Sequence, residues 1–213
     1  MNSQEKEITY KNTNSYSTLN TLTVQTKNVW LVCHGMGYLS RYFLRYFKNL
    51  NPDENYIIAP QAPSKFYIQP KMHVGANWLT RDDTETGMQN ILHYFDAIFE
   101  VENIPTSANF IVFGYSQGVS VAMRYLAKRN RQCNELVLHS GGIPKELKAI
   151  DFAYLSETTK VKLIYGTKDE YLDEDRIALE SKKAAELFGK RSEVIPFEGK
   201  HVVNVDFIMS LVE

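Results

Sequence analysis

The chain has 213 residues, of which 44% are hydrophobic and 23% are charged. Its 24 lysines and arginines nearly balance its 25 aspartates and glutamates, so nucleic acid and anionic membranes are poor candidates for a main partner, because both attract a basic excess. A chain of this length is expected to form one domain, residues 1–213, whose core is large enough to need no disulfide or metal ion.

The N-terminal region and the two cysteines indicate a cellular compartment. Residues Met1–Asn20 are polar and contain no apolar stretch of signal-peptide length, and no later window reaches the roughly 18 apolar residues of a membrane span. Cys33 and Cys133 are too few for a disulfide framework and are expected to be free thiols in a reducing compartment. We therefore expect a cytoplasmic protein without integral membrane association; a chain that begins after a removed signal is the alternative.

The first predicted element is an antiparallel edge. Between Glu7 and Thr26, apolar residues alternate weakly with polar ones, as at Ile8 and Tyr10, and turn-forming asparagines lie in between. Alternation of this kind is typical of a strand with one buried face. We expect residues 1–28 to form a hairpin at the edge of a sheet.

Short apolar runs then alternate with longer helical stretches. The runs are rich in β-branched and aromatic residues and are expected to be strands: Val29–Cys33, Tyr56–Ala59, Phe110–Phe113, Leu136–His139, Val161–Tyr165 and Val194–Phe197. Apolar residues at helical spacing predict helices at Arg41–Leu50, Thr84–Glu102, Gly118–Lys128, Asp175–Phe188 and Val205–Val212. The runs are apolar throughout, as in sheets covered on both faces, so the pattern indicates an α/β fold with a mostly parallel, doubly wound sheet.

Residues 59–83 fit no regular element. This stretch contains three prolines and the large side chains Phe66, Tyr67, Met72 and Trp78. It is longer than an ordinary connection, and long structured loops in compact domains are usually functional. We interpret it as a functional loop; a surface loop whose aromatic residues fill local core is a compatible interpretation.

The strongest motif is Gly-Tyr-Ser-Gln-Gly at residues 114–118. It follows the apolar run Phe110–Phe113 and precedes a helical stretch, which is the context of a nucleophile elbow, where a sharp turn between strand and helix exposes a serine. Glycines on either side are needed because a Cβ there would clash with the neighbouring strand and helix. We therefore predict that Ser116 is a nucleophile; the alternative is a tight turn with an idle serine.

A serine hydroxyl needs a base to take its proton and a carboxylate to orient that base. After an elbow these residues follow in the order Ser, Asp or Glu, His. His201, in a loop between the last strand and the last helix, is the predicted base, with His139 at the end of a strand as the alternative. The predicted acid is Asp169, the first carboxylate after Val161–Tyr165; the four acidic residues that follow suit a helix N-terminus.

Negative charge that develops on a substrate oxygen needs two backbone N–H donors. Gln117, directly after the serine, is expected to supply one of them, and Met36, in the loop after the first parallel strand, is expected to supply the other. His34 begins this loop and could itself act as a base. It comes too early in the chain order, however, and is expected to support the loop instead.

Other chemistries have little support in the sequence. There is no His-Glu-x-x-His or Cys-x-x-Cys motif for zinc, and no Gly-x-Gly-x-x-Gly follows a strand. The segment Gly189-Lys190-Arg191-Ser192 lacks the upstream glycine and the adjacent lysine and serine of a phosphate-binding loop. We therefore expect neither a metal ion nor a cofactor.

Taken together, these residues resemble the phospholipase/carboxylesterase family of small α/β hydrolases, which includes the acyl-protein thioesterases. The resemblance extends from about Trp30 to the C-terminus and rests on His34-Gly35-Met36-Gly37, Ala59-Pro60-Gln61-Ala62-Pro63, Gly75 with Trp78, the elbow with glutamine after its serine, Gly166-x-x-Asp169, and His201. It implies a triad and two oxyanion donors: Ser116, Asp169 and His201, with Met36 and Gln117. It also implies that residues 59–83 flank an acyl groove, with the candidate substrate-binding residues Phe66, Tyr67, Met72 and Trp78.

The chain also departs from the family pattern. Tyr38 stands where the family usually has an aspartate, and Glu170-Tyr171-Leu172 replaces a proline-containing sequence after the acid. The stretch between His139 and Val161 is too short for a large helical cap. We expect a serine hydrolase that cleaves ester or thioester bonds of small-molecule substrates with short to medium acyl groups, through an acyl-enzyme intermediate. A binding protein that keeps the fold without catalysis is the alternative.

Overall fold

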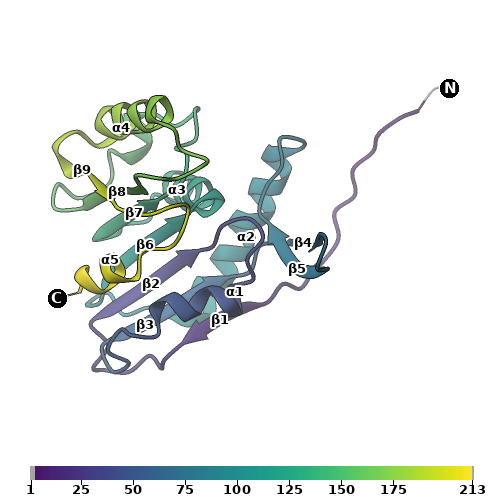
Figure 1. The fold of residues 1–213 in the computed structure, drawn as a ribbon. Coiled ribbons are helices and arrows are strands. Elements are labelled where there is room, and N and C mark those ends of the chain that lie inside the picture. Colours follow the sequence, from purple (N-terminus) through teal and green to yellow (C-terminus); the bar gives the residue numbers. More distant parts are fainter. Residues whose placement is uncertain (1–2, 213) are drawn as a thin grey trace.

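A seven-stranded sheet organises the protein, whose computed structural model describes residues 3–212 (Figure 1). The strand order is β1-β3-β2-β6-β7-β8-β9, and neighbouring strands are parallel except for β1 and β3. The strands are β1 (Tyr16–Leu19), β2 (Asn28–Cys33), β3 (Asn55–Pro60), β6 (Asn109–Tyr115), β7 (Glu135–His139), β8 (Lys160–Gly166) and β9 (Ser192–Phe197). The prediction of a mostly parallel α/β sheet in one domain is confirmed.

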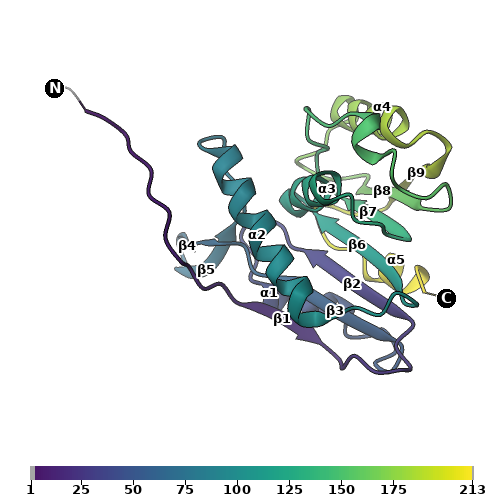
Figure 2. The same cartoon turned by 180° about the vertical axis from the view of Figure 1, so that it is seen from behind.

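Helices cover both faces of this sheet. One face carries α2 (Thr84–Glu102), α3 (Gln117–Arg129) and α4 (Glu174–Phe188), and the other carries α1 (Ser40–Phe43) and α5 (Val205–Ser210) (Figure 2). Short 3₁₀ turns add η1 (Leu44–Phe47), η2 (Ala149–Phe152) and η3 (Gly189–Arg191). Along β2, Leu31 belongs to the core under α2 and α3, whereas Trp30 belongs to the core under α1. Because successive side chains alternate between two buried faces, the central strands β2 and β6 are apolar along most of their length.

The first expected helix, Arg41–Leu50, is shorter than the sequence suggested. Only the four residues of α1 are α-helical, and the chain tightens into η1 directly afterwards. Aromatic residues have no strong helix preference, and the tighter turn lets Phe43, Leu44 and Phe47 all pack onto the sheet. Packing therefore decides the local geometry here.

The predicted N-terminal hairpin is wrong, although the antiparallel edge is present. Within residues 3–27 only β1 forms a strand, and it pairs with β3 at the edge of the sheet. Residues 3–15 form neither helix nor strand and extend away from the sheet (Figure 1). Ile8 and Tyr10, whose alternation suggested a strand, are exposed because no second strand lies beside them. Residues 1 and 2 of the predicted hairpin lie outside the described part of the chain.

The segment 59–83 is not an irregular loop. It contains a separate two-stranded antiparallel hairpin, β4 (Ser64–Ile68) and β5 (His73–Asn77). The three prolines of this segment argued against strands, because proline disrupts strand pairing. In the structure they lie outside β4 and β5 and do not interrupt either strand. Gly37 N–H donates to the carbonyl of Ala76 at 2.8 Å, so the hairpin is attached to the loop that follows β2.

Both cysteines are free and buried. Cys33 ends β2, and Cys133 precedes β7. Burial raises the pKa of the Cys33 thiol, and burial together with the nearby Glu135 carboxylate raises the pKa of Cys133 to about 12. In residues 3–212, no helix is both long and apolar enough to cross a membrane.

Candidate active site

The serine between β6 and α3 has an unusual backbone conformation. Ser116 has φ 53° and ψ −120°, a region that residues with a Cβ rarely adopt. A strained serine between a strand and a helix is the geometry of a nucleophile elbow. Its N–H donates to the carbonyl of His139 on the neighbouring strand at 2.8 Å, and α3 begins at the next residue, which brings the positive end of a helix beside the serine.

Two glycines make this turn possible. A Cβ at Gly118 would overlap the carbonyl oxygen of Cys33 on β2, and a Cβ at Gly114 would overlap the backbone of Val119 on α3. In both cases the obstacle is backbone, which cannot rotate aside as a side chain can. The two glycines of the Gly-x-Ser-x-Gly pattern are therefore required because α3 lies so close to the sheet.

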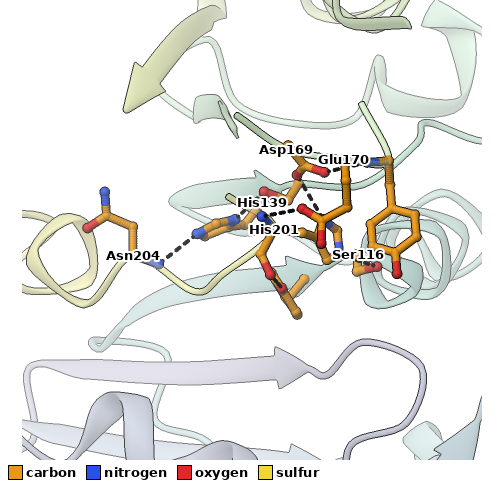
Figure 3. Close-up of polar contacts among 9 residues, drawn as sticks. Ser116, His139, Asp169, Glu170, His201 and Asn204 are labelled. Carbon is orange, nitrogen blue, oxygen red and sulfur yellow. Dashed lines mark hydrogen bonds and ion pairs between the residues drawn. The ribbon is translucent and has the colours of Figure 1, made fainter. Parts of the chain in front are cut away.

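Three side chains from separate loops form one hydrogen-bonded chain (Figure 3). Ser116 Oγ lies 3.1 Å from His201 Nε2, and His201 Nδ1 lies 2.8 Å from Asp169 Oδ2. A carboxylate at Nδ1 keeps the proton on that nitrogen, so Nε2 faces the hydroxyl as an acceptor. The Asp169 side chain is fully buried and that of His201 is 14% exposed. The three residues that the sequence singled out thus meet in space, in an arrangement that can remove a proton from a hydroxyl.

Asp169 differs from the acidic residues that follow it. Its Oδ1 accepts the N–H of Tyr171 at 2.9 Å while its Oδ2 contacts His201, so both oxygens are held. Asp173 caps α4 by accepting a backbone N–H at 2.8 Å, and the next two acidic residues lie in the first turn of that helix. Carboxylates at such positions stabilise a helix start, and they do not contact the imidazole.

The loops that carry the acid and the base pack closely together. A Cβ at Gly166, the last residue of β8, would overlap the carbonyl oxygen of Gly199. Val202 N–H donates to Lys200 O at 2.8 Å, so a tight three-residue turn centres on His201. These backbone contacts restrict the conformation of the loop that carries the imidazole.

The predicted oxyanion donors belong to the elbow and to the neighbouring loop after β2. Gly35 lies so close that a Cβ there would be 3.1 Å from Ser116 Cβ, which brings the following residue, Met36, to the same end of the sheet. The backbone N–H of Met36 and that of Gln117 donate to no other group within residues 3–212. Two free N–H groups, one of them at a helix N-terminus, suit an oxygen that gains negative charge.

The Gln117 side chain explains why glutamine follows the serine. Its Nε2 donates to Asn77 Oδ1 at 2.6 Å and to the carbonyl of Leu79 at 2.7 Å, while its Oε1 accepts the N–H of Trp78 at 2.9 Å. These bonds join the elbow to the end of the β4–β5 hairpin. The hairpin therefore has a defined position beside the serine.

The two alternative histidines have structural contacts. His34 is buried, its Nδ1 lies 2.8 Å from Gly35 O, and its Nε2 accepts the N–H of Ala62 at 3.2 Å. Burial lowers its pKa to about 4. His139 is also buried, and its Nε2 accepts the N–H of Asn204 at 3.0 Å. With these nitrogens occupied, neither imidazole faces the Ser116 hydroxyl.

The four candidate substrate-binding residues fall into two groups. Phe66, Tyr67 and Met72 lie on the β4–β5 hairpin with 40%, 63% and 50% of their surfaces exposed, and Met36 nearby is 61% exposed. Trp78 is 2% exposed and its Nε1 donates to His34 O at 2.8 Å. The expectation that Trp78 lines a groove is therefore wrong. It is a core residue: its ring packs against His34 and against Phe95 of α2, and its one N–H donor has a buried partner.

Two residues beside His201 belong to the site but were not predicted from the sequence. The Tyr171 ring meets the imidazole edge-on with centroids 4.8 Å apart. Glu170 Oε2 accepts the N–H of His201 at 3.4 Å (Figure 3), and bonds from its own N–H and from that of His201 hold the pKa of this carboxylate below its usual range. The available signal was their position, directly after the acid and in place of the family's proline-containing sequence.

Comparison with known proteins connects this geometry to a family. The family model described as Phospholipase/Carboxylesterase matches residues 15–213. The chain belongs to this family. Membership in the phospholipase/carboxylesterase family places the protein among the α/β hydrolases of ester-type substrates. No curated protein sequence matches the chain.

Solved structures agree with the phospholipase/carboxylesterase fold. Acyl-protein thioesterase 2 from Zea mays superposes with a TM-score of 0.70 at 16% identity, covering 94% of this chain and 98% of that one. Esterase PE8 gives a TM-score of 0.66 at 18% identity, covering 93% and 97%. A phospholipase/carboxylesterase from Dyadobacter fermentans gives 0.62 at 19% identity, covering 96% of both chains. At these identities the likeness establishes the fold.

The described side chains offer no metal centre. Among residues 3–212, no three His, Cys, Asp or Glu side chains are grouped so that they could hold a metal ion.

Proposed function

We propose that the protein is a serine esterase or thioesterase that transfers short to medium acyl groups to water through an acyl-enzyme intermediate. In this proposal Ser116 is the nucleophile, His201 is the general base, and Asp169 orients the imidazole. The observation that carries it is the continuous chain from Ser116 Oγ through His201 to Asp169, with distances of 3.1 and 2.8 Å. Family membership supports the reaction type, and the Zea mays relative is by name an acyl-protein thioesterase.

Acylation begins when Ser116 Oγ attacks the carbonyl carbon of the substrate. The hydroxyl proton passes to His201 Nε2, and the imidazolium that forms is stabilised by the buried Asp169 carboxylate. The carbonyl oxygen becomes negatively charged and accepts hydrogen bonds from the N–H groups of Met36 and Gln117. When the intermediate collapses, the bond to the leaving alkoxide or thiolate breaks, and the leaving group takes the proton from His201.

Deacylation repeats these steps with water. His201 Nε2 removes a proton from the water as it attacks the acyl carbon of the Ser116 ester, and the oxyanion again lies against the two N–H donors. Collapse of this second intermediate breaks the bond to Oγ, which recovers the proton from the imidazolium. The products are a carboxylic acid and free enzyme.

The proposed acyl length follows from what surrounds the site. The exposed apolar side chains of Met36, Phe66, Tyr67 and Met72 suit an apolar acyl chain. Between β7 and β8, residues 140–159 include only the short turn η2 as regular structure, which is not enough to cover a long chain. We therefore propose short to medium acyl groups rather than long lipids.

Replacement of the nucleophile tests the proposal. Ser116→Ala is expected to lower kcat for a p-nitrophenyl butyrate or a butyryl thioester by on the order of 10³-fold or more, since only binding and the oxyanion donors remain. A fluorophosphonate probe should label the wild type at Ser116 and leave the variant unlabelled. Near-full activity in a variant with an unchanged circular dichroism spectrum would refute the mechanism. A wild type that neither hydrolyses esters nor takes the label would indicate a binding protein.

A further inference from the structure

Two side chains that the proposed mechanism does not use connect the nucleophile to the loop of the base. Tyr115 and His139 are register partners on the adjacent strands β6 and β7. Both are buried, and their rings meet edge-on with centroids 5.2 Å apart. Tyr115 directly precedes Ser116, and the carbonyl of His139 accepts the Ser116 N–H at 2.8 Å. The pair is therefore attached to the nucleophile through backbone.

The His139 side chain reaches the loop that carries the base. Its Nε2 accepts the N–H of Asn204 at 3.0 Å (Figure 3), and its Nδ1 lies 3.1 Å from Ser140 Oγ. Since Nε2 is an acceptor, Nδ1 carries the proton and donates to the hydroxyl. Burial, and secondarily the nearby charge of His201, lower the pKa of His139 to about 3. The imidazole therefore stays neutral at ordinary pH and keeps its acceptor.

The Tyr115 side chain reaches the same loop from the other side. Its hydroxyl donates to the carbonyl of His201 at 2.9 Å, and its ring lies 5.2 Å from the imidazole of His201 between centroids. One edge of the ring lies against Gly35, where an added Cβ would be 3.0 Å from Tyr115 Cδ1. One rigid side chain thus spans from the predicted oxyanion loop to the predicted base.

The contact between His139 and Asn204 bears on the position of His201. It caps α5, because its side chain accepts the N–H of Phe207 at 3.0 Å, and only two residues separate it from His201. The chain from His201 to Asn204 is consequently fixed at both ends: at the His201 carbonyl by Tyr115 and at the Asn204 N–H by His139. A shift in either contact moves the imidazole relative to Ser116 Oγ.

We propose that Tyr115 and His139 act together as positioning residues, hereafter the Tyr115–His139 clamp, which holds the residue 201–204 segment where the imidazole of His201 meets Ser116. The proposal rests on the triad mechanism proposed above. The clamp touches no reacting atom. It acts on kcat through the Ser116–His201 distance, because catalytic groups lose rate steeply when they are misplaced by a fraction of an ångström.

Three substitutions separate the hydrogen bonds from the packing. Tyr115→Phe removes one hydroxyl and keeps the ring. His139→Phe keeps a buried ring and removes the acceptor, whereas His139→Gln places an amide oxygen near the position of Nε2 and restores it. We expect Tyr115→Phe and His139→Phe each to lower kcat for a p-nitrophenyl ester by about tenfold to 100-fold, with KM within about threefold of wild type. His139→Gln should recover most of the lost kcat.

Tyr154→Phe is the matched control. The Tyr154 hydroxyl donates to the carbonyl of Leu126 at 2.7 Å, away from the site, so this variant loses a comparable tyrosine–carbonyl bond and should keep kcat. Because Tyr115 and His139 hold the same segment, the double Phe variant should lose less than the product of the single losses. The rate of fluorophosphonate labelling at Ser116 should fall in parallel with kcat.

The outcomes distinguish the clamp from the mechanism on which it rests. If Ser116→Ala abolishes hydrolysis but Tyr115→Phe and His139→Phe keep kcat within twofold, with melting temperatures lowered as in Tyr154→Phe, only the clamp proposal is overturned. A raised KM with unchanged kcat would also overturn it, since that result assigns the residues to substrate binding. If Ser116→Ala retains activity, the proposed function itself fails.

Discussion

The elbow at residues 114–118 and the β4–β5 hairpin both contact the loop after β2, yet they are built in opposite ways. At the elbow, Gly114 and Gly118 leave no room for a Cβ, and Ser116 has a strained backbone. On the hairpin, every residue of β4 is exposed. The elbow is constrained by its neighbours on all sides, whereas the hairpin presents the side chains of β4 to solvent.

This difference suggests a division of roles, in which the elbow holds the triad geometry and the hairpin contacts the substrate. The proposed mechanism needs fixed distances between Ser116, His201 and Asp169, and buried backbone contacts around the elbow supply them. The hairpin is attached near its base, where Gly37 N–H bonds to Ala76 O and the Gln117 side chain bonds to Asn77. Under the proposed function, substitutions on the hairpin are expected to change selectivity among substrates without disturbing the triad. The expectations below test this division, from the largest effect to the smallest.

The largest effect is expected at the acid. Asp169→Asn should lower kcat by up to roughly 10⁴-fold, because an amide at this position favours the wrong imidazole tautomer. Asp173→Asn is the matched control, since that side chain caps α4 and asparagine is an equally good cap. Parallel kcat measurements on the two variants decide the assignment. Greater sensitivity at Asp173 would show that the acid has been misplaced.

The packing at the elbow should appear in stability. Gly118→Ala forces a methyl group against the Cys33 carbonyl and is expected to destabilise the fold by about 3 kcal/mol or more. Gly87→Ala, within α2, meets only the movable end of the Leu79 side chain and should be neutral or slightly stabilising. Urea unfolding of both variants measures the contrast. Equal unfolding midpoints would mean that α3 can move away from the sheet.

Acid is expected to lower the free energy of unfolding through two buried histidines near the elbow, and not through the exposed hairpin. Burial lowers the pKa of His34 to about 4 and of His139 to about 3, from an ordinary value of 6.5. The unfolded chain therefore binds protons that the folded chain does not, so stability is full above pH 6.5 and falls as the pH drops toward 4 and 3. Each histidine should contribute about 1.4 kcal/mol per pH unit within its window.

Urea unfolding midpoints at several pH values measure this slope. His139→Gln is expected to flatten the pH dependence, as is His34→Gln, even if both variants are less stable at neutral pH. His73 lies exposed on β5, so His73→Gln should reproduce the wild-type slope. If all three variants showed the same pH dependence of the unfolding midpoint as the wild type, a buried, neutral state of His34 and His139 would be contradicted.

The hairpin should change selectivity by the smallest factor. Phe66→Ala and Tyr67→Ala are expected to lower kcat/KM for an octanoate ester relative to a butyrate ester by about three- to tenfold, as one or two methylenes lose an apolar contact. Unfolding free energy should change by no more than about 0.5 kcal/mol. Ile150→Ala, at another exposed apolar position, is the control. Faster wild-type turnover of a sixteen-carbon ester than of butyrate would contradict the proposed chain length.

The sequence predicted those features that depend on a single local requirement, such as burial of a strand or the chain order of the triad residues. Continuous apolar runs predicted the parallel strands: central strands such as β2 and β6 are buried on both faces, whereas β9 at the edge of the sheet is partly exposed. The order of Ser116, Asp169 and His201 predicted which residues the fold brings together, although their catalytic roles stay predictions. The hairpin and the burial of Trp78 could not be foreseen, since both depend on contacts with His34 and the loop after β2 that are distant in sequence. The contacts of Glu170, Tyr171 and the Tyr115–His139 clamp escaped for the same reason.

The burial of the two thiols has a practical consequence for measuring thioester cleavage. A disulfide reagent that turns yellow on contact with thiolates reports the thiol that such a reaction releases. Cys33 and Cys133 are buried and their pKa values are raised, and a protonated, inaccessible thiol reacts poorly with such reagents. The folded protein should therefore contribute little colour of its own. A slow appearance of two thiols per chain would instead mark unfolding, so one cuvette can follow both turnover and loss of the fold.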